Sequence, residues 1–204
     1  MAHPFPETMK VGILALQGDV GEHVAQMRSA IGNLGMDAEV REVRRPPELE
    51  GLAGLLIPGG ESTTISKQLK RFGLFQPIKD MAGQGIPIMG TCAGCILVAK
   101  KIVNEPENRK VEPLGLIDIT VNRNAYGRQK ESFERMLDVK DFEEPYAGVF
   151  IRAPAIEVVG DYIEILAKLD ERPVMVRKDN ILALTFHPEL VQDTRIHEYF
   201  LSMI

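Results

Sequence analysis

The sequence predicts an α/β fold in which helices cover both faces of a mixed, mostly parallel central sheet, as in a three-layer sandwich. In the first half of the chain, short apolar runs alternate with segments whose apolar residues recur at helical spacing. This alternation indicates βαβ units and parallel strands. In the second half, apolar runs follow one another with few helices between them, which favours antiparallel pairs.

Four strands and four helices are expected in the first half. The strands are Lys10–Leu16, Ala38–Val43, Leu52–Ile57 and Ile86–Met89, and the helices are Glu22–Leu34, Ser62–Phe72, Pro77–Ala82 and Cys95–Lys101. Gly35 is a typical C-terminal stop for the first helix. Ligands of such sheets bind beyond the carboxyl ends of the strands. The loops after the first, third and fourth strands are therefore expected to line one crevice.

The second half is expected to contain six strands and a final helix. The strands are Leu116–Val121, Met136–Val139, Gly148–Ile151, Ile163–Leu169, Val174–Arg177 and Ile181–Phe186, and the helix is Asp193–Met203, with Asp193 or Thr194 as its cap.

Length and composition favour a soluble one-domain protein. The 204 residues suit a single sizeable core. Residues 1–9 contain no apolar run and are expected to be a loose extension, and residues 10–204 to form the domain. The net charge of -5 disfavours a nucleic-acid partner. The sequence contains no run of about 18 apolar residues, so no membrane-spanning helix is expected. Two cysteines are too few for a disulfide framework, so a cytoplasmic location is expected.

The strongest chemical motif is Gly90-Thr91-Cys92-Ala93-Gly94, which has the form of a nucleophile elbow. The nucleophile of an elbow sits on a strained turn, so the residues two positions away must be small. The N–H groups and dipole of the following helix favour a thiolate and the anion of acyl transfer. Two other interpretations stay open for these residues: a packing turn with an inert cysteine, and a redox C-x-x-C pair formed with Cys95.

A cysteine nucleophile needs a base, and His187 is the strongest candidate. It follows the last expected strand, and Glu189 can turn back to hold its imidazole in the right tautomer. A structural His-Pro turn is the alternative. His3 lies in the loose extension, and His197 is expected to be exposed. His23 opens the first helix and could approach the crevice, but it is expected to cap or pack there.

Pro58-Gly59-Gly60-Glu61-Ser62 follows the third strand. Paired glycines let backbone N–H groups approach a ligand closely, so the loop could form an oxyanion hole or hold a phosphate. It lacks the Gly-Lys-Ser/Thr of a nucleotide-binding P-loop. A simple turn into a helix capped by Ser62 or Thr63 is the alternative.

Together these residues resemble the class I, or triad, glutamine amidotransferase family, whose core is flavodoxin-like. Cys92, His187 and Glu189 match the family's catalytic triad in type and chain order. A narrower resemblance, to the family of glutaminase subunits of pyridoxal 5′-phosphate synthase, spans nearly all of the chain from Lys10 to Ile204. The segments that carry it are Leu16–Gly18, Pro58–Thr64, Gly90–Gly94, Arg123-Asn124, Gly127–Gln129, Gly148–Pro154 and Phe186–Leu190.

The resemblance implies a glutaminase that docks on a synthase subunit and supplies it with ammonia. The synthase joins the ammonia with a pentose phosphate and a triose phosphate, and docking switches the glutaminase on. No metal or organic cofactor is implied for the glutaminase reaction. The resemblance assigns L-glutamine binding to Gly60, Glu61, Ser62, Arg123, Ile151 and Arg152, and the oxyanion to the backbone around Gly60 and Ala93. Gln17 would lie beside the site.

Other functions remain open on the sequence alone. The same elbow could serve a cysteine peptidase or a related hydrolase, the fold could be retained as a non-enzymatic regulatory module, and the ammonia could go to another acceptor synthase. Cys95 stands where a larger aliphatic residue is usual in the family, and it raises the possibility of an inactivating disulfide with Cys92.

Overall fold

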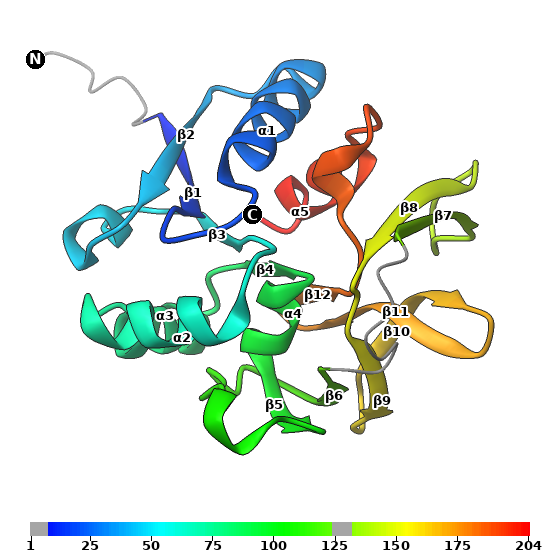
Figure 1. Ribbon diagram of the computed structural model, residues 1–204. Coiled ribbons are helices and arrows are strands. Elements are labelled where there is room, and N and C mark those ends of the chain that lie inside the picture. Colours follow the sequence, from blue (N-terminus) through cyan, green and yellow to red (C-terminus); the bar gives the residue numbers. More distant parts are fainter. Residues whose placement is uncertain (1–7, 124–131) are drawn as a thin grey trace, which may run out of the picture.

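The computed structural model describes residues 8–123 and 132–204, which are built around a seven-stranded sheet of order β10-β11-β12-β4-β3-β1-β2 (Figure 1). Its strands are β1 (Met9–Leu14), β2 (Ala38–Val43), β3 (Gly54–Ile57), β4 (Ile88–Thr91), β10 (Glu164–Leu169), β11 (Arg172–Lys178) and β12 (Ile181–Leu184). Every neighbouring pair is parallel except the two pairs made by β11. The expectation of a mixed, mostly parallel sheet is therefore confirmed.

Helices cover both faces of this sheet. The helices are α1 (Val20–Leu34), α2 (Ser62–Arg71), α3 (Phe75–Gly83), α4 (Ala93–Val98) and α5 (Arg195–Leu201), with short 3-10 turns η1 (Pro46–Leu49), η2 (Glu107–Arg109) and η3 (Pro188–Leu190). Met27 of α1 and Phe200 of α5 share one buried apolar cluster, whereas Leu69 of α2 and Ile78 of α3 belong to another. Side chains of a strand alternate between the two faces, so the sheet supplies residues to both clusters. The three-layer sandwich is thus built from two apolar cores, one on each face.

Two smaller sheets flank the main one. The first contains β5 (Ala99–Val103), β6 (Ile117–Asn122) and β9 (Ala155–Val159), and the second contains β7 (Ser132–Leu137) and β8 (Tyr146–Ile151). The helix expected over Cys95–Lys101 is wrong in its second half, because α4 ends at Val98 and the chain continues as β5, which pairs in parallel with β6. The β-branched Ile102 and Val103 suit this strand better than a helix. The strand β9 was not expected.

The second half forms antiparallel pairs as expected, with one exception that matters for the site. The pairs β10–β11, β11–β12, β6–β9 and β7–β8 are antiparallel, but β12 adds to β4 in parallel. The carboxyl end of β12 therefore lies beside the carboxyl end of β4.

Local sequence signals predict the C-terminal end of α1 more accurately than its start. The helix begins at Val20, two residues before its expected start, and Gly35 adopts a left-handed conformation with φ 61° and donates its N–H to the carbonyls of Ile31 and Gly32. The expected stop is confirmed. Strand β1 begins at Met9, and residues 1–7 of the expected extension lie outside the described residues. Among the helices of the described ranges, none combines the length and apolar character that crossing a bilayer requires.

Candidate active site

Four loops converge at the carboxyl edge of the parallel strands. Strands β12, β4, β3 and β1 are neighbours in the sheet, and the chain leaves their carboxyl ends through His187, Cys92, Gly59–Ser62 and Gln17–Asp19 respectively. These loops line a cleft of about 450 Å³. The cleft lies where ligands of α/β sheets bind, so the expected crevice exists.

Cys92 occupies a sharp turn between β4 and α4. Its backbone has φ 48° and ψ -102°, a conformation that a residue with a side chain rarely adopts, and its side chain is buried at the floor of the cleft. A Cβ atom on Gly94 would lie 2.0 Å from the carbonyl oxygen of Ile57, and one on Gly90 would lie 2.6 Å from the backbone of Gly94. Only glycine fits at both positions, which is the packing that a nucleophile elbow requires.

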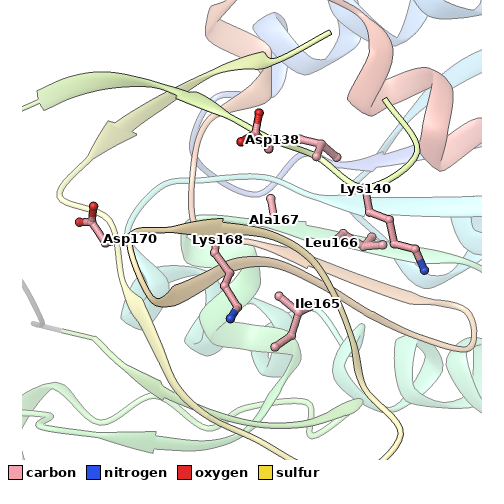
Figure 2. Close-up of a pocket in the computed structure, with 8 residues that line it drawn as sticks. Asp138, Lys140, Ile165, Leu166, Ala167, Lys168 and Asp170 are labelled. Atoms are coloured by element: carbon pink, nitrogen blue, oxygen red, sulfur yellow. The ribbon is translucent and has the colours of Figure 1, made fainter. Parts of the chain in front are cut away.

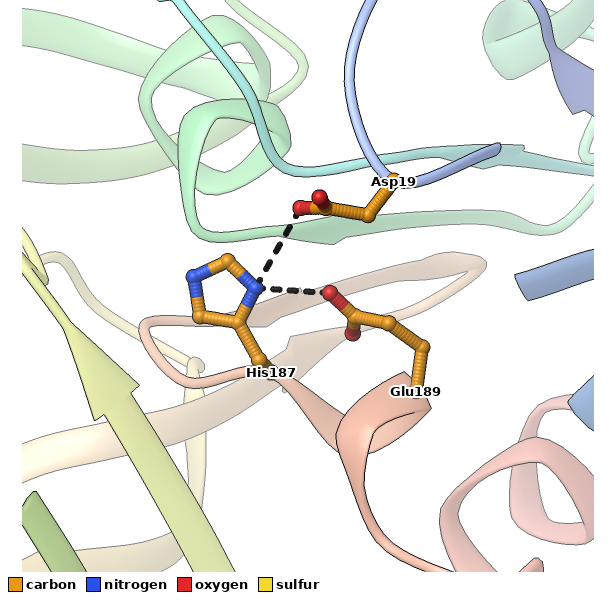
Figure 3. Close-up of side chains that lie close together, drawn as sticks. All are labelled: Asp19, His187 and Glu189. Carbon is orange, nitrogen blue, oxygen red and sulfur yellow. Dashed lines mark hydrogen bonds and ion pairs between the residues drawn. The ribbon is translucent and has the colours of Figure 1, made fainter. Parts of the chain in front are cut away.

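His187 faces the cleft from the segment that follows β12. Its backbone N–H donates to the Val149 carbonyl of β8 at 2.8 Å, which anchors the turn. The imidazole Nδ1 lies 2.6 Å from Oε1 of Glu189, which η3 turns back toward the ring, as Figure 3 shows. The opposite ring nitrogen, Nε2, is buried and has no oxygen or nitrogen partner among the described residues. It is therefore the nitrogen left to interact with the Cys92 sulfur.

The charges of this group suit a nucleophile. Burial by itself lowers the pKa of His187, but Cys92 and the Glu189 carboxylate outweigh it and raise the pKa to about 10. The imidazole is therefore protonated at neutral pH, and an imidazolium beside Cys92 favours the thiolate. Burial raises the pKa of Glu189, while His187 opposes that shift. By contrast, burial raises the pKa of the Cys95 thiol strongly, so Cys95 is an unreactive core side chain.

Asp19 is a site residue that the sequence did not single out. Its Oδ2 lies 3.5 Å from His187 Nδ1, the same nitrogen that the Glu189 carboxylate contacts (Figure 3). In the sequence, it was marked only by its place in the loop after the first strand, one of the loops expected to line the crevice. Asp19, His187 and Glu189 offer three ligand-type atoms within 4.8 Å of one another. However, the 2.6 Å bond to Glu189 calls for a proton on Nδ1, which leaves that nitrogen no lone pair for a metal.

The loop after β3 holds a charged pair at the rim of the cleft. Glu61, not the expected Ser62 or Thr63, is the residue that caps α2, because its carboxylate accepts the N–H groups of Thr63 and Thr64. The same carboxylate lies 2.6 Å from the Arg123 guanidinium. Glutamate caps helices less often than aspartate or serine, and the pairing with a distant arginine could not be read locally.

Gln17 reaches across this loop from the end of β1. Its Oε1 accepts the Glu61 N–H at 2.7 Å, and a Cβ atom on Gly60 would lie only 2.5 Å from the same oxygen. Gly60 has φ 140°. The glycine is therefore needed both for this backbone conformation and for the approach of the Gln17 amide.

Ile151 and Arg152 enter the cleft from the end of β8. Arg152 has φ 44°, an uncommon value for a residue with a side chain, and makes no hydrogen bond or ion pair with another described residue. Arg123 is engaged differently, since it pairs with Glu61 and donates to the Arg109 carbonyl at 2.7 Å. Within the described ranges, the guanidinium of Arg152 is thus unpaired in the cleft, as is that of the exposed Arg109.

The cleft brings together nearly all of the residues that the sequence proposed. Those that line it are Gly60, Glu61, Ser62, Cys92, Ala93, Arg123, Ile151, Arg152 and His187. Glu189 is buried behind His187 rather than in the lining. Asn124 and Gly127–Gln129, which contributed to the resemblance, lie outside the described residues.

His197 contradicts the sequence expectation, because it is fully buried rather than exposed. It lies on the face of α5 that packs against α1, where it contacts the equally buried His23. Only the packing of α5 against α1 places this histidine in the core.

A second hollow lies away from the elbow, between β10 and the segment after β7 (Figure 2). The charged side chains that line it are Asp138, Lys140, Lys168 and Asp170, and Lys140 pairs with Glu164. Its lining includes no cysteine, histidine or hydroxyl side chain, so it offers none of the groups of a nucleophile–histidine pair.

Two solved structures that share this fold are described as glutamine amidotransferases. One, 46% identical, superposes with a TM-score of 0.82 over 95% of this chain and 97% of its own. Another, from Thermotoga maritima, is 13% identical with a TM-score of 0.61, covering 94% of this chain and 81% of its own, and supports the fold alone.

The chain belongs to the SNO glutamine amidotransferase family, whose model matches residues 13–204. Among its relatives is a protein of Pyrococcus horikoshii named pyridoxal 5′-phosphate synthase subunit PdxT, 50% identical over 96% of this chain and the whole of the relative. A protein of the same name from Thermococcus gammatolerans is 49% identical over 95% of this chain and 98% of the relative.

Proposed function

We propose that this chain is the glutaminase subunit of a pyridoxal 5′-phosphate synthase, with Cys92 as its nucleophile. The observation that carries the proposal is the cleft in which the strained Cys92 meets an imidazole held by Glu189 at 2.6 Å. Family membership and near-full-length relatives named as subunits of that synthase support the substrate, L-glutamine, and the partner.

The reaction follows from the charges of the triad. The Cys92 thiolate attacks the side-chain amide carbon of glutamine, and the resulting oxyanion accepts hydrogen bonds from backbone N–H groups around Ala93 and Gly60. The N–H of Ala93 opens α4 and has no partner within the helix. The imidazolium of His187 gives its proton to the leaving nitrogen, so ammonia departs and a glutamyl thioester remains. Neutral His187 then takes a proton from water, which hydrolyses the thioester to glutamate.

Substrate binding is assigned to the rim of the same cleft. The α-carboxylate of glutamine suits the guanidinium of Arg152, which has no other partner among the described residues. Gly60, Glu61, Ser62, Arg123 and Ile151 complete the binding site. Glu61 and Arg123 already neutralise each other, so they can contact the polar amino-acid end without leaving a buried charge.

The partner in this proposal is a synthase subunit that takes ammonia from the cleft and joins it with a pentose phosphate and a triose phosphate. Because the reaction needs Cys92 as a free thiol, and both cysteines are free, we place the chain in the reducing cytoplasm. The glutaminase half-reaction needs no cofactor.

The test is glutamate release from glutamine, measured with and without the synthase subunit. Cys92→Ala is expected to abolish release in both cases, whereas Cys95→Ala, which removes a buried thiol outside the cleft, is expected to retain it. Full activity of Cys92→Ala would contradict the nucleophile. Formation of pyridoxal 5′-phosphate only when glutamine, both sugar phosphates and both chains are present would support the partner. Release of ammonia to a different synthase would contradict it.

A glutamine-analogue diazo-ketone separates the proposal from a peptidase. Covalent labelling of Cys92 by this reagent, with protection by glutamine, is the expected result. Cleavage of a peptide bond without glutamine-dependent protection would instead favour a cysteine peptidase.

A further inference from the structure

Two buried histidines lie behind the catalytic carboxylate. His23 of α1 has its Nε2 3.2 Å from Oε2 of Glu189 and 3.1 Å from Oγ1 of Thr91, and its Nδ1 lies 3.1 Å from Nε2 of His197 of α5. Neither histidine has measurable exposure. Polar contacts therefore run from His187 through Glu189 into the layer between α1 and α5, although Oε2 of Glu189 makes no hydrogen bond with a described residue.

The protons of these contacts can be placed by elimination. Burial lowers the pKa of His23 well below its ordinary value, with His197 and His187 adding to the effect, and burial lowers the pKa of His197 to about 4. Each ring is therefore neutral at neutral pH and carries one proton. A carboxylate only accepts hydrogen bonds, so the proton of His23 is on Nε2, where it is shared with Oγ1 of Thr91 and lies close to Oε2 of Glu189 without completing a hydrogen bond to it.

The bare Nδ1 of His23 then accepts from Nε2–H of His197. The remaining nitrogen, Nδ1 of His197, has no hydrogen-bond partner among the described residues, as this assignment requires of an unprotonated nitrogen.

We infer that His23 is a positioning residue for the glutaminase reaction: the positive edge of its imidazole at Nε2 lies 3.2 Å from one oxygen of Glu189 and attracts it, so that the other oxygen faces His187, and His197 holds His23 in the tautomer that does so. This inference rests on the proposed function and deepens it, because it assigns a role to two residues outside the cleft.

The physical reason is that a buried carboxylate oxygen without a hydrogen bond depends on nearby polar groups. Oε2 of Glu189 is such an atom, and without His23 it would also lose this polar contact, which raises the free energy of the ionised form and weakens its hold on the imidazolium. His23 also contacts Thr91, the residue before the nucleophile. One imidazole thus touches both the strand end that carries Cys92 and the carboxylate that orients His187.

The competing explanation is that His23 and His197 only fill the core between α1 and α5. The two explanations differ in what a substitution at His23 must preserve. Core filling needs volume, whereas positioning needs a donor at the place of Nε2. A glutamine amide nitrogen reaches approximately that place, an asparagine amide nitrogen reaches only that of Nδ1, and leucine fills space without a donor.

The test compares His23→Gln, His23→Asn and His23→Leu in the full chain with its synthase subunit, measuring kcat and KM for glutamine and the urea midpoint of unfolding. Positioning predicts that kcat falls about 10- to 100-fold in His23→Leu and His23→Asn while KM stays within about twofold, and that His23→Gln recovers most of kcat. The matched control is Met27→Ala, a buried position one turn along α1. It is expected to lower the urea midpoint without changing kcat.

A proton NMR measurement reads the same geometry without activity. The proton between His187 Nδ1 and Glu189 is expected far downfield in the wild type and in His23→Gln, and shifted or lost in His23→Asn. Equal kcat values for the Gln and Asn variants, a His23→Leu variant within threefold of wild type, or an unchanged downfield proton in His23→Asn would each overturn the inference. If the wild type itself released no glutamate, the proposed function would fail instead, and the NMR comparison would still decide the positioning role.

Discussion

Gly94 is the position where one added methyl group tests how the elbow holds Cys92. A Cβ atom built there lies 2.0 Å from the carbonyl oxygen of Ile57 and 2.9 Å from its carbonyl carbon. Non-bonded carbon and oxygen atoms approach to about 3.3 Å at closest. Gly94→Ala therefore requires the start of α4 and the end of β3 to separate by about 1.3 Å.

Neither the end of β3 nor the start of α4 can move easily. Ile57 is fully buried and pairs with Gly90 of the neighbouring strand β4, and α4 begins directly after Cys92. Forcing extra atoms into a packed interior costs about 1 to 3 kcal/mol of unfolding free energy, and this backbone contact belongs at the upper end, about 3 kcal/mol. A displacement of the nucleophile by about 1 Å costs on the order of 100-fold in rate.

Gly94→Ala is therefore expected to lower kcat/KM about 100-fold and the unfolding free energy by about 3 kcal/mol. The measurements are glutamate release with the synthase subunit and urea unfolding followed by circular dichroism. Gly32→Ala is the matched control, since Gly32 is exposed inside α1 with no atom within 4 Å of its added Cβ. It should stabilise the chain by about 0.5 to 1 kcal/mol at unchanged activity. A Gly94→Ala protein within threefold of wild-type kcat/KM would refute the view that this contact positions Cys92.

The site leads to four further predictions. The pKa of His187, raised to about 10, keeps the imidazole protonated for ammonia release, so kcat should hold through neutral pH and fall only as pH rises toward 10. Cys92→Ala removes the sulfur that helps to raise the pKa of His187, so the His187 pKa measured by NMR should drop. An unchanged pKa would contradict the interaction between Cys92 and His187. Arg152→Gln should raise KM for glutamine about 10- to 100-fold with a smaller change in kcat, because one charged hydrogen-bonding partner is worth about 1.5 to 3 kcal/mol. The exposed Arg135, outside the cleft, serves as its control in Arg135→Gln, and equal KM values for both variants would exclude Arg152 as the carboxylate ligand. Iodoacetamide should modify one thiol in the folded chain and a second only after unfolding, since Cys95 is buried with a raised pKa; two thiols reacting at one rate would contradict this.

The local part of the site could be predicted from the sequence, because it depends on residues that are close together in the chain. The elbow follows from small residues two positions on either side of Cys92, and Pro188 and Glu189 lie close enough to His187 for a turn to bring the carboxylate back to the ring. Gly35 ended α1 as expected.

The features missed from the sequence depend on segments that are far apart in the chain. Asp19 meets His187 only because β1 and β12 lie in one sheet with β3 and β4 between them. His197 looked like a surface residue of the last helix until α5 packed on α1. The failure of α4 to continue into Lys101 likewise depended on the parallel strand β6.

Periodicity, glycine placement and the order of chemical residues were enough to indicate an α/β sheet with a cysteine elbow, because each of these signals acts over a few neighbouring residues. The meeting of Cys92, His187 and Glu189 at one edge of the sheet was decided by the tertiary structure. The last strand could have joined the sheet in either direction, and only its parallel addition beside β4 brings His187 to the same edge as Cys92. That choice, like the burial of His23 and His197 behind Glu189, is made by the packing of whole elements, which no local pattern encodes.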